Sequence, residues 1–325
     1  MKKRFATTPD SEIAQYHSSE MEARGIHRRE FLKFCTAITA AMGLPFTAVA
    51  QVAKVISNPQ RPPVIWLHLQ ECTGCTESLL RATHPKVEDL ILDMISLDYS
   101  ETLMAAAGHQ AESALQASVN QNTGKFILVV EGSIPTKNNG LYCQIGGRTA
   151  QEIVEDIGPK ALAAIAIGSC ASWGGVQSAS PNPTGAVGLN KILTEIPVIA
   201  LPGCPASPYN LLSTILYYLT LKKLPELDDQ GRPLFAYEHT IHEYCERRLQ
   251  FEAGNFAEQF GDEGHLAGHC LYFLGCKGPE THANCSTIRY GDTGSWPVGG
   301  GHPCFGCAEE GVGFTKPAFE EVEDI

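Results

Sequence analysis

The sequence predicts an α/β fold, an open doubly wound parallel sheet followed by a small loop-rich domain. Between about residues 62 and 223, short apolar runs alternate with helical stretches. The runs are rich in β-branched residues and do not alternate with polar ones, as is typical of parallel strands buried on both faces. After about residue 225, glycine and proline are dense and apolar runs are few. The formal net charge of −12 argues against nucleic acid as a partner.

The first segment in chain order is a leader. Residues 1–50 carry a net charge of +2, whereas the rest of the chain carries −14. Arg28 and Arg29 precede a largely uncharged run, residues 34–50, which ends in Ala48-Val49-Ala50. A basic region, an apolar run and an A-x-A site predict a secretory signal, and the paired arginines indicate the twin-arginine type. The mature chain is then expected to begin near Gln51. The alternative is an amphipathic anchoring helix.

The mature chain is expected to form two domains, residues 51–225 and 226–325. The first contains four expected strands, at residues 64–69, 126–130, 161–167 and 197–201. Expected helices lie between or after them, among others at residues 76–82, 149–157 and 210–223. This βαβ succession predicts an open sheet of the flavodoxin-like kind. The longest apolar candidate after the leader, residues 211–221, contains three polar residues and is too short to span a bilayer.

Four cysteines follow three of the expected strands. Cys72 and Cys75 follow the first strand, Cys170 follows the third and Cys204 follows the fourth. Ligands in open α/β sheets bind beyond the carboxyl ends of the strands, so these thiols are positioned to converge. Cysteines that only packed in the core would lie within the strands, not in the turns after them. We therefore expect a shared metal site, with four unrelated structural thiols as the alternative.

A second set of candidate ligands lies in the loop-rich domain: His242, Cys245, Cys270, Cys276, Cys285, Cys304 and Cys307. Zinc is the main competing metal because C-x-x-C pairs often bind it. Disulfides compete as well, because an exported protein meets an oxidising compartment. The two sets together provide eleven ligands, which do not divide into fours. Two four-ligand 4Fe–4S clusters and one three-ligand 3Fe–4S cluster use all eleven, so the count favours iron–sulfur.

Several sequence blocks between residues 61 and 314 are jointly specific: ECTGCTES at 71–78, EGSIP at 131–135, GSC at 168–170, NPTGA at 182–186, PGCP at 202–205, GCKGP at 275–279 and HPCFGC at 302–307. Together they resemble the small subunit of nickel–iron hydrogenases. The resemblance is closest to the exported, respiratory uptake type, in which a twin-arginine leader precedes the small subunit.

The resemblance implies how the ligands divide among three clusters. A proximal 4Fe–4S cluster would be held by Cys72, Cys75, Cys170 and Cys204. A medial 3Fe–4S cluster would be held by Cys285, Cys304 and Cys307, with Pro297 in the place of a fourth cysteine. A distal 4Fe–4S cluster, near the surface where the electron leaves, would be held by His242, Cys245, Cys270 and Cys276. Cys35 and Cys143 stay outside this scheme.

The implied function is that of an electron-transfer subunit of a heterodimeric hydrogenase. The large subunit would hold the nickel–iron centre and split H2, and electrons would pass through the three clusters to a cytochrome or quinone-linked acceptor. The expected location is the periplasm. Membrane-attached relatives carry a C-terminal hydrophobic helix, and no such helix is present before Ile325. Three expectations stay open: a soluble enzyme, a membrane partner that anchors it, or a C-terminal helix missing from this sequence.

Two other functions compete with this interpretation. A cluster subunit of a quinone-reducing respiratory complex would resemble the first domain only, and a zinc-stabilised binding protein would contain no iron. A further expectation concerns oxygen. Oxygen-tolerant hydrogenases replace two glycines near the proximal cluster with cysteines, and the matching positions here are Gly74 and Gly175. An enzyme that loses activity in air is therefore expected.

Overall fold

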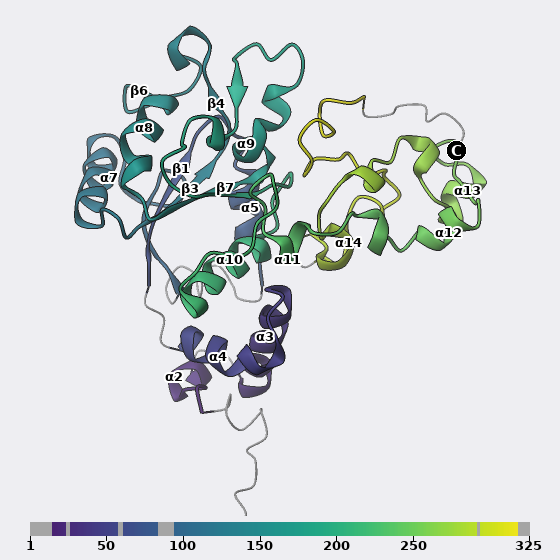
Figure 1. Cartoon of the computed structure of the whole chain (residues 1–325), viewed down its shortest axis with the longest axis horizontal. Helices are drawn as coiled ribbons and strands as arrows, with labels where there is room; N and C mark the ends of the chain where they lie inside the picture. The colour runs from purple at the N-terminus through teal and green to yellow at the C-terminus, as the bar shows by residue number, and fades with distance from the viewer. Residues whose placement is uncertain (1–14, 24–26, 58–60, 84–93, 291–292, 318–325) are drawn as a thin grey trace, which may run out of the picture.

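The computed structural model describes residues 15–23, 27–57, 61–83, 94–290 and 293–317. Figure 1 shows three parts: an α/β part, a second part that extends from it to one side, and a group of N-terminal helices below it. The described N-terminal helices are α2 (Ser19–Ala23), α3 (Arg28–Ala41) and α4 (Val49–Ser57).

A five-stranded parallel sheet forms the centre of the α/β part. Its strands are β1 (Pro63–His68), β2 (Ser96–Ser100), β3 (Ile127–Glu131), β7 (Ala163–Ile167) and β9 (Val198–Leu201). They lie in the order β2-β1-β3-β7-β9, and every neighbouring pair is parallel. This is the flavodoxin-like strand order, so the predicted fold class is confirmed. The four strands expected from the sequence are β1, β3, β7 and β9.

The sequence did not indicate β2, because this strand lies at the edge of the sheet. Its residues Ser96-Leu97-Asp98-Tyr99-Ser100 are mostly polar, and only the last two are buried. An edge strand pairs on one side only and needs less apolar surface than a central one. The Asp98 carboxylate accepts hydrogen bonds from Ser118 and Asn122 at 2.6 and 3.2 Å, which accounts for a charged residue in a strand.

Helices cover both faces of the sheet, as a doubly wound fold requires. Residues in register, Trp66, Val129, Ile165 and Ile199, point into one core, which α5 (Gly74–Leu80) and α10 (Pro208–Leu221) cover. The alternate residues point into a second core, which α7 (His109–Gln121) and α8 (Ala150–Ile157) cover. The expected helices correspond to α5, α8 and α10. A capping box formed by Thr149 and Glu152 begins α8 where the sequence places its start.

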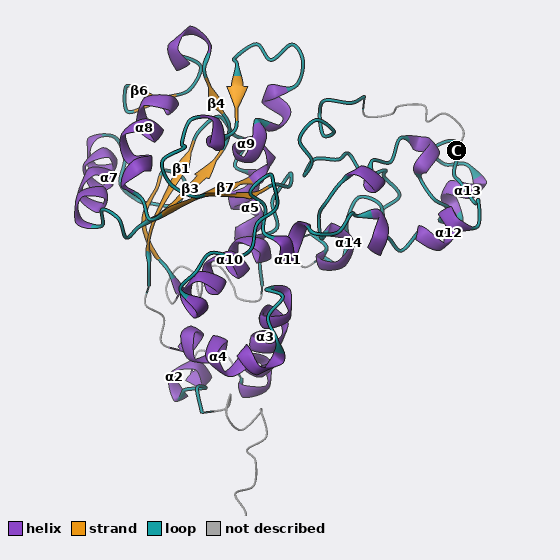
Figure 2. Ribbon diagram, viewed as in Figure 1, coloured by secondary structure: helices purple, strands orange, loops and turns teal. Residues whose placement is uncertain are grey.

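Short elements complete the α/β part. Helix α9 (Gly168–Trp173) follows β7 directly, and two small antiparallel pairs are formed by β4 (Ile134–Pro135) with β8 (Ala186–Val187) and by β5 (Gln144–Ile145) with β6 (Arg148–Thr149). The described helices of the second part have only four or five residues: α11 (Leu234–Tyr237), α12 (Arg248–Glu252), α13 (Glu263–Leu266) and α14 (Cys285–Ile288). Figure 2 shows them joined by long loops. The change from long elements to short helices and loops begins between α10 and α11, and the domain boundary at residue 225 stays a prediction.

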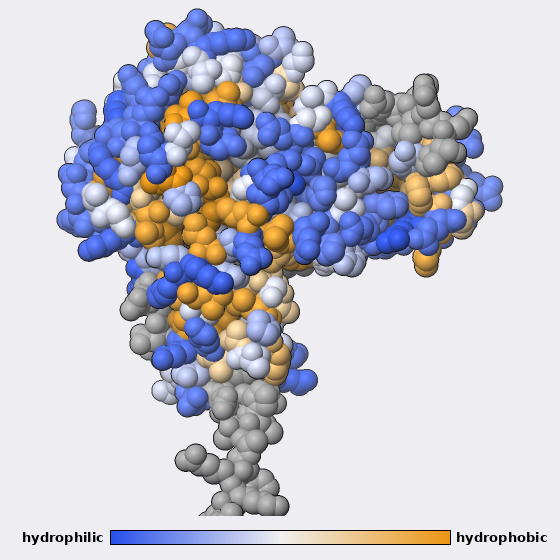
Figure 3. Space-filling view, viewed as in Figure 1, coloured by the Kyte–Doolittle hydropathy of each residue, from blue (hydrophilic) through white to orange (hydrophobic). Residues whose placement is uncertain are grey.

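The N-terminal helices pack on the α/β part instead of standing apart. Ile38, Met42 and Val52 join the core that lies under α10, and Gln51 Nε2 donates to the Thr220 carbonyl at 2.8 Å. Figure 3 shows apolar residues continuing from the lower α/β part onto these helices. Over the described residues, every helix is too short or too polar to cross a bilayer.

Candidate metal centres

The first cavity with sulfur ligands lies at the carboxyl edge of the sheet. Cys72, Cys75, Cys170 and Cys204 line one cavity of about 100 Å³, together with the loops that follow β1, β3, β7 and β9. The structure therefore brings together the four cysteines that the sequence places after three different strands. Burial raises the pKa of the Cys170 thiol to about 11, and it raises the pKa values of Cys75 and Cys204 as well. A buried thiol with a raised pKa gives up its proton when a metal binds it.

Glycine at position 168 leaves room for the Cys75 sulfur. Gly168 has φ +81°, and a Cβ built on it would lie 2.5 Å from the Cys75 Sγ. Any side chain here would displace the sulfur, so the first residue of α9 has to be glycine. The space that glycine leaves open is the space that the thiols surround.

A buried carboxylate holds the Cys72–Cys75 loop. Glu131, at the end of β3, is 2% exposed and accepts the backbone N–H groups of Cys75 and Thr76 at 2.9 and 3.3 Å. Its other oxygen accepts the Thr76 hydroxyl at 2.6 Å. Glu131 thus satisfies free N–H groups at the start of α5, which are the groups that a helix N-terminus leaves without partners. These contacts make Glu131 a structural support for the loop.

His68 lies behind this carboxylate in the core, with hydrogen bonds at one ring nitrogen only. Its Nε2 contacts the hydroxyls of Ser100 and Thr102 at 3.1 and 3.0 Å, and its Nδ1 lies 3.7 Å from Glu131. Burial lowers the pKa of His68, and the Glu131 charge opposes that shift without reversing it. His68 is therefore a neutral core imidazole held by two hydroxyls, and it does not line the first cavity.

The second cavity is lined by the cysteines of the C-terminal loops. Cys285, Cys304 and Cys307 surround about 280 Å³, and Pro297 lines the same cavity. Cys204 of the first cavity also lines the second, so the two adjoin. Burial, followed by the neighbouring Cys285, raises the pKa of Cys307 to about 12. The Gly306 backbone N–H donates to the Cys304 Sγ at 3.4 Å, a contact that favours a thiolate.

The third cavity combines three thiols with one imidazole. His242, Cys245, Cys270 and Cys276 line it, and its volume of about 20 Å³ is the smallest of the three. The fit of a cluster here therefore rests on the donor set and not on free volume. The Arg247 backbone N–H donates to the Cys245 Sγ at 3.4 Å. The Cys304 N–H donates to the Cys276 Sγ, also at 3.4 Å, which links the third site to the second.

The remaining cysteines lie elsewhere. Cys35 is buried in α3 and Cys143 is half-buried against the second core, away from the three cavities. All twelve cysteines lie within the described residues, and all are free thiols. Among the described residues, no group of three or more His, Cys, Asp or Glu side chains is arranged to hold a single metal ion. The predicted ligands instead surround cavities.

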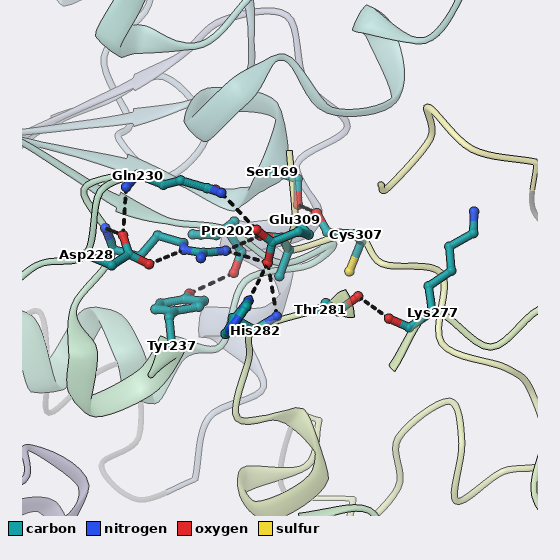
Figure 4. A network of polar contacts seen from close by, with 12 residues as sticks. Ser169, Pro202, Asp228, Gln230, Tyr237, Lys277, Thr281, His282, Cys307 and Glu309 are labelled. Atoms are coloured by element: carbon teal, nitrogen blue, oxygen red, sulfur yellow. Dashed lines mark hydrogen bonds and ion pairs between the residues drawn. The ribbon is translucent and has the colours of Figure 1, made fainter. Parts of the chain in front are cut away.

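Sequence reasoning missed a buried ionic network that joins the turn at residues 228–232 to the loop after Cys307 (Figure 4). The Arg232 guanidinium donates to Asp228 at 2.7 Å, and to Glu309 and the Ala308 carbonyl at 2.9 and 3.2 Å. Glu309 follows Cys307 by two residues, so the network holds the loop that carries this candidate ligand in place. Arg232 and Glu309 are far apart in the sequence, and no helical or strand period links them. The sequence could therefore not have predicted this pair.

Comparisons with known proteins identify the family of this chain. The family model for the 20 kDa subunit of NADH ubiquinone oxidoreductase matches residues 72–218, and the model for the C-terminal region of the NiFe/NiFeSe hydrogenase small subunit matches residues 237–320. The Hydrogenase-2 small chain of Escherichia coli (strain K12) is 55% identical over 91% of this chain and 80% of its own length. This chain belongs to the nickel–iron hydrogenase small-subunit family.

Other relatives give the same result for this hydrogenase small subunit. A periplasmic [NiFe] hydrogenase small subunit 1 of Nitratidesulfovibrio vulgaris is 50% identical over 92% of this chain and 94% of its own. The small chain of a quinone-reactive Ni/Fe-hydrogenase of Wolinella succinogenes is 48% identical over 93% and 85%. Among solved structures, a Ni-Fe-Se hydrogenase from Desulfomicrobium baculatum has a TM-score of 0.72 and 36% identity, over 77% of this chain and 95% of that one.

The family assignment decides between the competing interpretations. The model from the quinone-linked respiratory complex matches the first domain only, as expected if the two families share that domain, and the hydrogenase model covers the second. The prediction of a hydrogenase subunit, which functions as part of a complex with a large subunit, is confirmed. A zinc-stabilised binding protein is not supported.

Proposed function

We propose that this chain is the electron-transfer subunit of an H2-oxidising enzyme and holds three iron–sulfur clusters. The proximal 4Fe–4S cluster belongs to Cys72, Cys75, Cys170 and Cys204, the medial 3Fe–4S cluster to Cys285, Cys304 and Cys307, and the distal 4Fe–4S cluster to His242, Cys245, Cys270 and Cys276. Such clusters supply one-electron redox steps whose potentials depend on ligand type and hydrogen bonds. The observation that carries the proposal is that each predicted ligand set lines one cavity.

The first cavity supports clusters over single zinc ions. Four thiolates around zinc lie about 2.3 Å from one central ion, which brings the sulfurs close together. Here four thiols line a cavity of about 100 Å³. A cluster with several irons needs such a space between its ligands.

Metal analysis of the anaerobically purified heterodimer tests the proposal. About eleven iron atoms are expected per small subunit, in addition to the iron of the nickel–iron centre. Oxidised enzyme should show the electron paramagnetic resonance (EPR) signal of a 3Fe–4S cluster. A preparation dominated by zinc, or iron for only one cluster, would refute the assignment.

We further propose that the enzyme works in the periplasm and reduces a quinone-linked or cytochrome acceptor. The leader with Arg28 and Arg29 supports export, and both arginines lie exposed at the start of α3. The name of the quinone-reactive Wolinella relative supports the acceptor class. Replacing both arginines with lysine should retain the enzyme in the cytoplasm, as cell fractionation would show. Membranes supplied with H2 should reduce quinone, and release of electrons to soluble carriers only would count against a quinone-linked acceptor.

A further inference from the structure

One buried hydroxyl joins the loops of the proximal site to the loop of the medial site. Ser169 is 1% exposed and directly precedes the proximal ligand Cys170. Its Oγ donates to the carbonyl of the medial ligand Cys307 at 2.5 Å. The same Oγ accepts the N–H of Gly203, the residue before Cys204, at 3.0 Å. Figure 4 shows the Ser169 side chain directed at the Cys307 backbone.

We propose that Ser169 is a positioning residue that fixes the separation and orientation of the proximal and medial sites. The inference rests on the ligand sets of the proposed function. The hydroxyl has one donor and can accept at its lone pairs, and here it uses both capacities between ligand-bearing loops. Because the group is buried, water does not compete for either bond, and a lost bond leaves a polar group without a partner.

A further backbone contact strengthens this junction. The Ser169 N–H donates to the Gly203 carbonyl at 3.0 Å, so residues 169 and 203 are bonded in both directions. The loops after β7 and β9 therefore form one unit. The Ser169 hydroxyl attaches the Cys307 backbone to it, and the Cys204 backbone also hydrogen-bonds the Cys307 thiol. The described helices of the second part are too short to position that loop by helix packing alone.

The Arg232 network holds the same segment differently. It binds Ala308 and Glu309 to the turn that contains Asp228, and this turn carries no candidate ligand. Loss of Arg232 should therefore reduce the stability of the second part. Loss of the Ser169 hydroxyl should instead loosen the contact between two ligand loops while each loop keeps its own ligands.

The test is Ser169→Ala in the assembled enzyme, with Ser172→Ala as the matched control. Ser172 lies on the same helix, is 6% exposed, and donates to the Ala166 carbonyl of β7 at 3.2 Å. Both variants should retain full iron content. EPR then measures the magnetic interaction between the proximal and medial sites. Ser169→Ala should weaken the magnetic interaction and widen the distribution of its strengths. Ser172→Ala should leave both as in the wild type.

Activity gives a second comparison. Ser169→Ala should lower H2 oxidation with an external acceptor several-fold and leave hydrogen isotope exchange at the nickel unchanged. An unchanged magnetic interaction in Ser169→Ala, or the same change in Ser172→Ala, overturns the proposal. If Ser169→Ala does not assemble, Ser169→Thr, which retains a hydroxyl, should keep the interaction, and its loss in a fully iron-loaded Thr variant overturns the proposal.

Amide hydrogen exchange in the wild-type enzyme provides a test that needs no variant. The Gly203 N–H should exchange slowly because it is bonded to a buried hydroxyl, and fast exchange contradicts the proposal. Iron analysis of the wild type separates the two hypotheses. Wild-type enzyme without the three clusters refutes the proposed function, whereas intact clusters with an unaffected Ser169→Ala variant refute only the role of Ser169.

Discussion

Replacing Arg232 with methionine should destabilise the second part of the chain. The Arg232 side chain is 5% exposed, and its partners Glu309 and Asp228 are 10% and 19% exposed. Methionine has a similar length but no charge, so Arg232→Met leaves two carboxylates without their cation. Removing one partner of a buried ion pair costs about 3–5 kcal/mol, because the other charge stays buried.

The contacts that remain place the expected loss at the lower end of this range. Glu309 still accepts from Gln230 Nε2 at 2.8 Å and from the His282 N–H at 3.0 Å. Asp228 still accepts the backbone N–H of residue 232 at 2.8 Å. We therefore expect a loss of about 3 kcal/mol, with a lower thermal midpoint than the wild type.

The pH dependence of stability provides a second check on the contribution of the Arg232–Glu309 pair. Burial alone would raise the pKa of Glu309, but hydrogen bonds from Arg232 and the His282 N–H outweigh it and hold the pKa below the ordinary value. A lowered pKa means that the stabilisation exists above the pKa of the unfolded chain and disappears as pH falls through the folded pKa. The gap between wild type and Arg232→Met should therefore narrow in acid.

Thermal unfolding of the assembled enzyme, followed by circular dichroism at pH 8 and at a pH below the ordinary glutamate pKa, measures both effects. The control is Arg81→Met. Its ion pair with Glu77 has a similar 2.7 Å distance but side chains 66% and 54% exposed, and such pairs contribute less than about 1 kcal/mol. The double variant Arg232→Met/Glu309→Leu should recover part of the loss. An Arg232→Met midpoint equal to that of the control would show that the network does not stabilise the enzyme.

Four further predictions concern the sites. Pro297 lines the same cavity as the medial cysteines, so Pro297→Cys should convert the 3Fe–4S cluster towards 4Fe–4S with a lower potential, and an unchanged 3Fe–4S EPR signal would contradict this. His242→Ala should reduce H2 oxidation with the physiological acceptor far more than isotope exchange at the nickel; equal losses would mean that His242 is only structural. With glycine at positions 74 and 175, H2 oxidation current on an electrode should fall when O2 is added, and a sustained current would refute the expectation. Burial raises the pKa of Glu101 to about 7, so wild-type stability falls as pH rises from the ordinary glutamate pKa to 7. Glu101→Gln should therefore raise the thermal midpoint at pH 8 but not at pH 4, and an equal change at both pH values would exclude burial of the charge as the cause.

The sequence alone determined the sheet and the identity of the candidate ligands. Central strands such as β3 are buried on both faces, so their apolar composition is visible in any short window. Cysteines that follow strands in a parallel sheet must reach the same edge, which is why Cys72, Cys170 and Cys204 could be grouped before their positions were known. Thiols are scarce and chemically specific, so their spacing carries information that a serine or a glutamate does not.

Only the tertiary structure decided how the sites are joined. The edge strand β2, the pairing of Arg232 with Glu309 and the bond from Ser169 to Cys307 connect residues whose separation follows no helical or strand period. Polar side chains at such positions are ordinary in sequence and become distinctive only when burial removes water and makes each partner necessary. The contacts between ligand loops therefore depend on packing across the whole chain, which no local sequence pattern records.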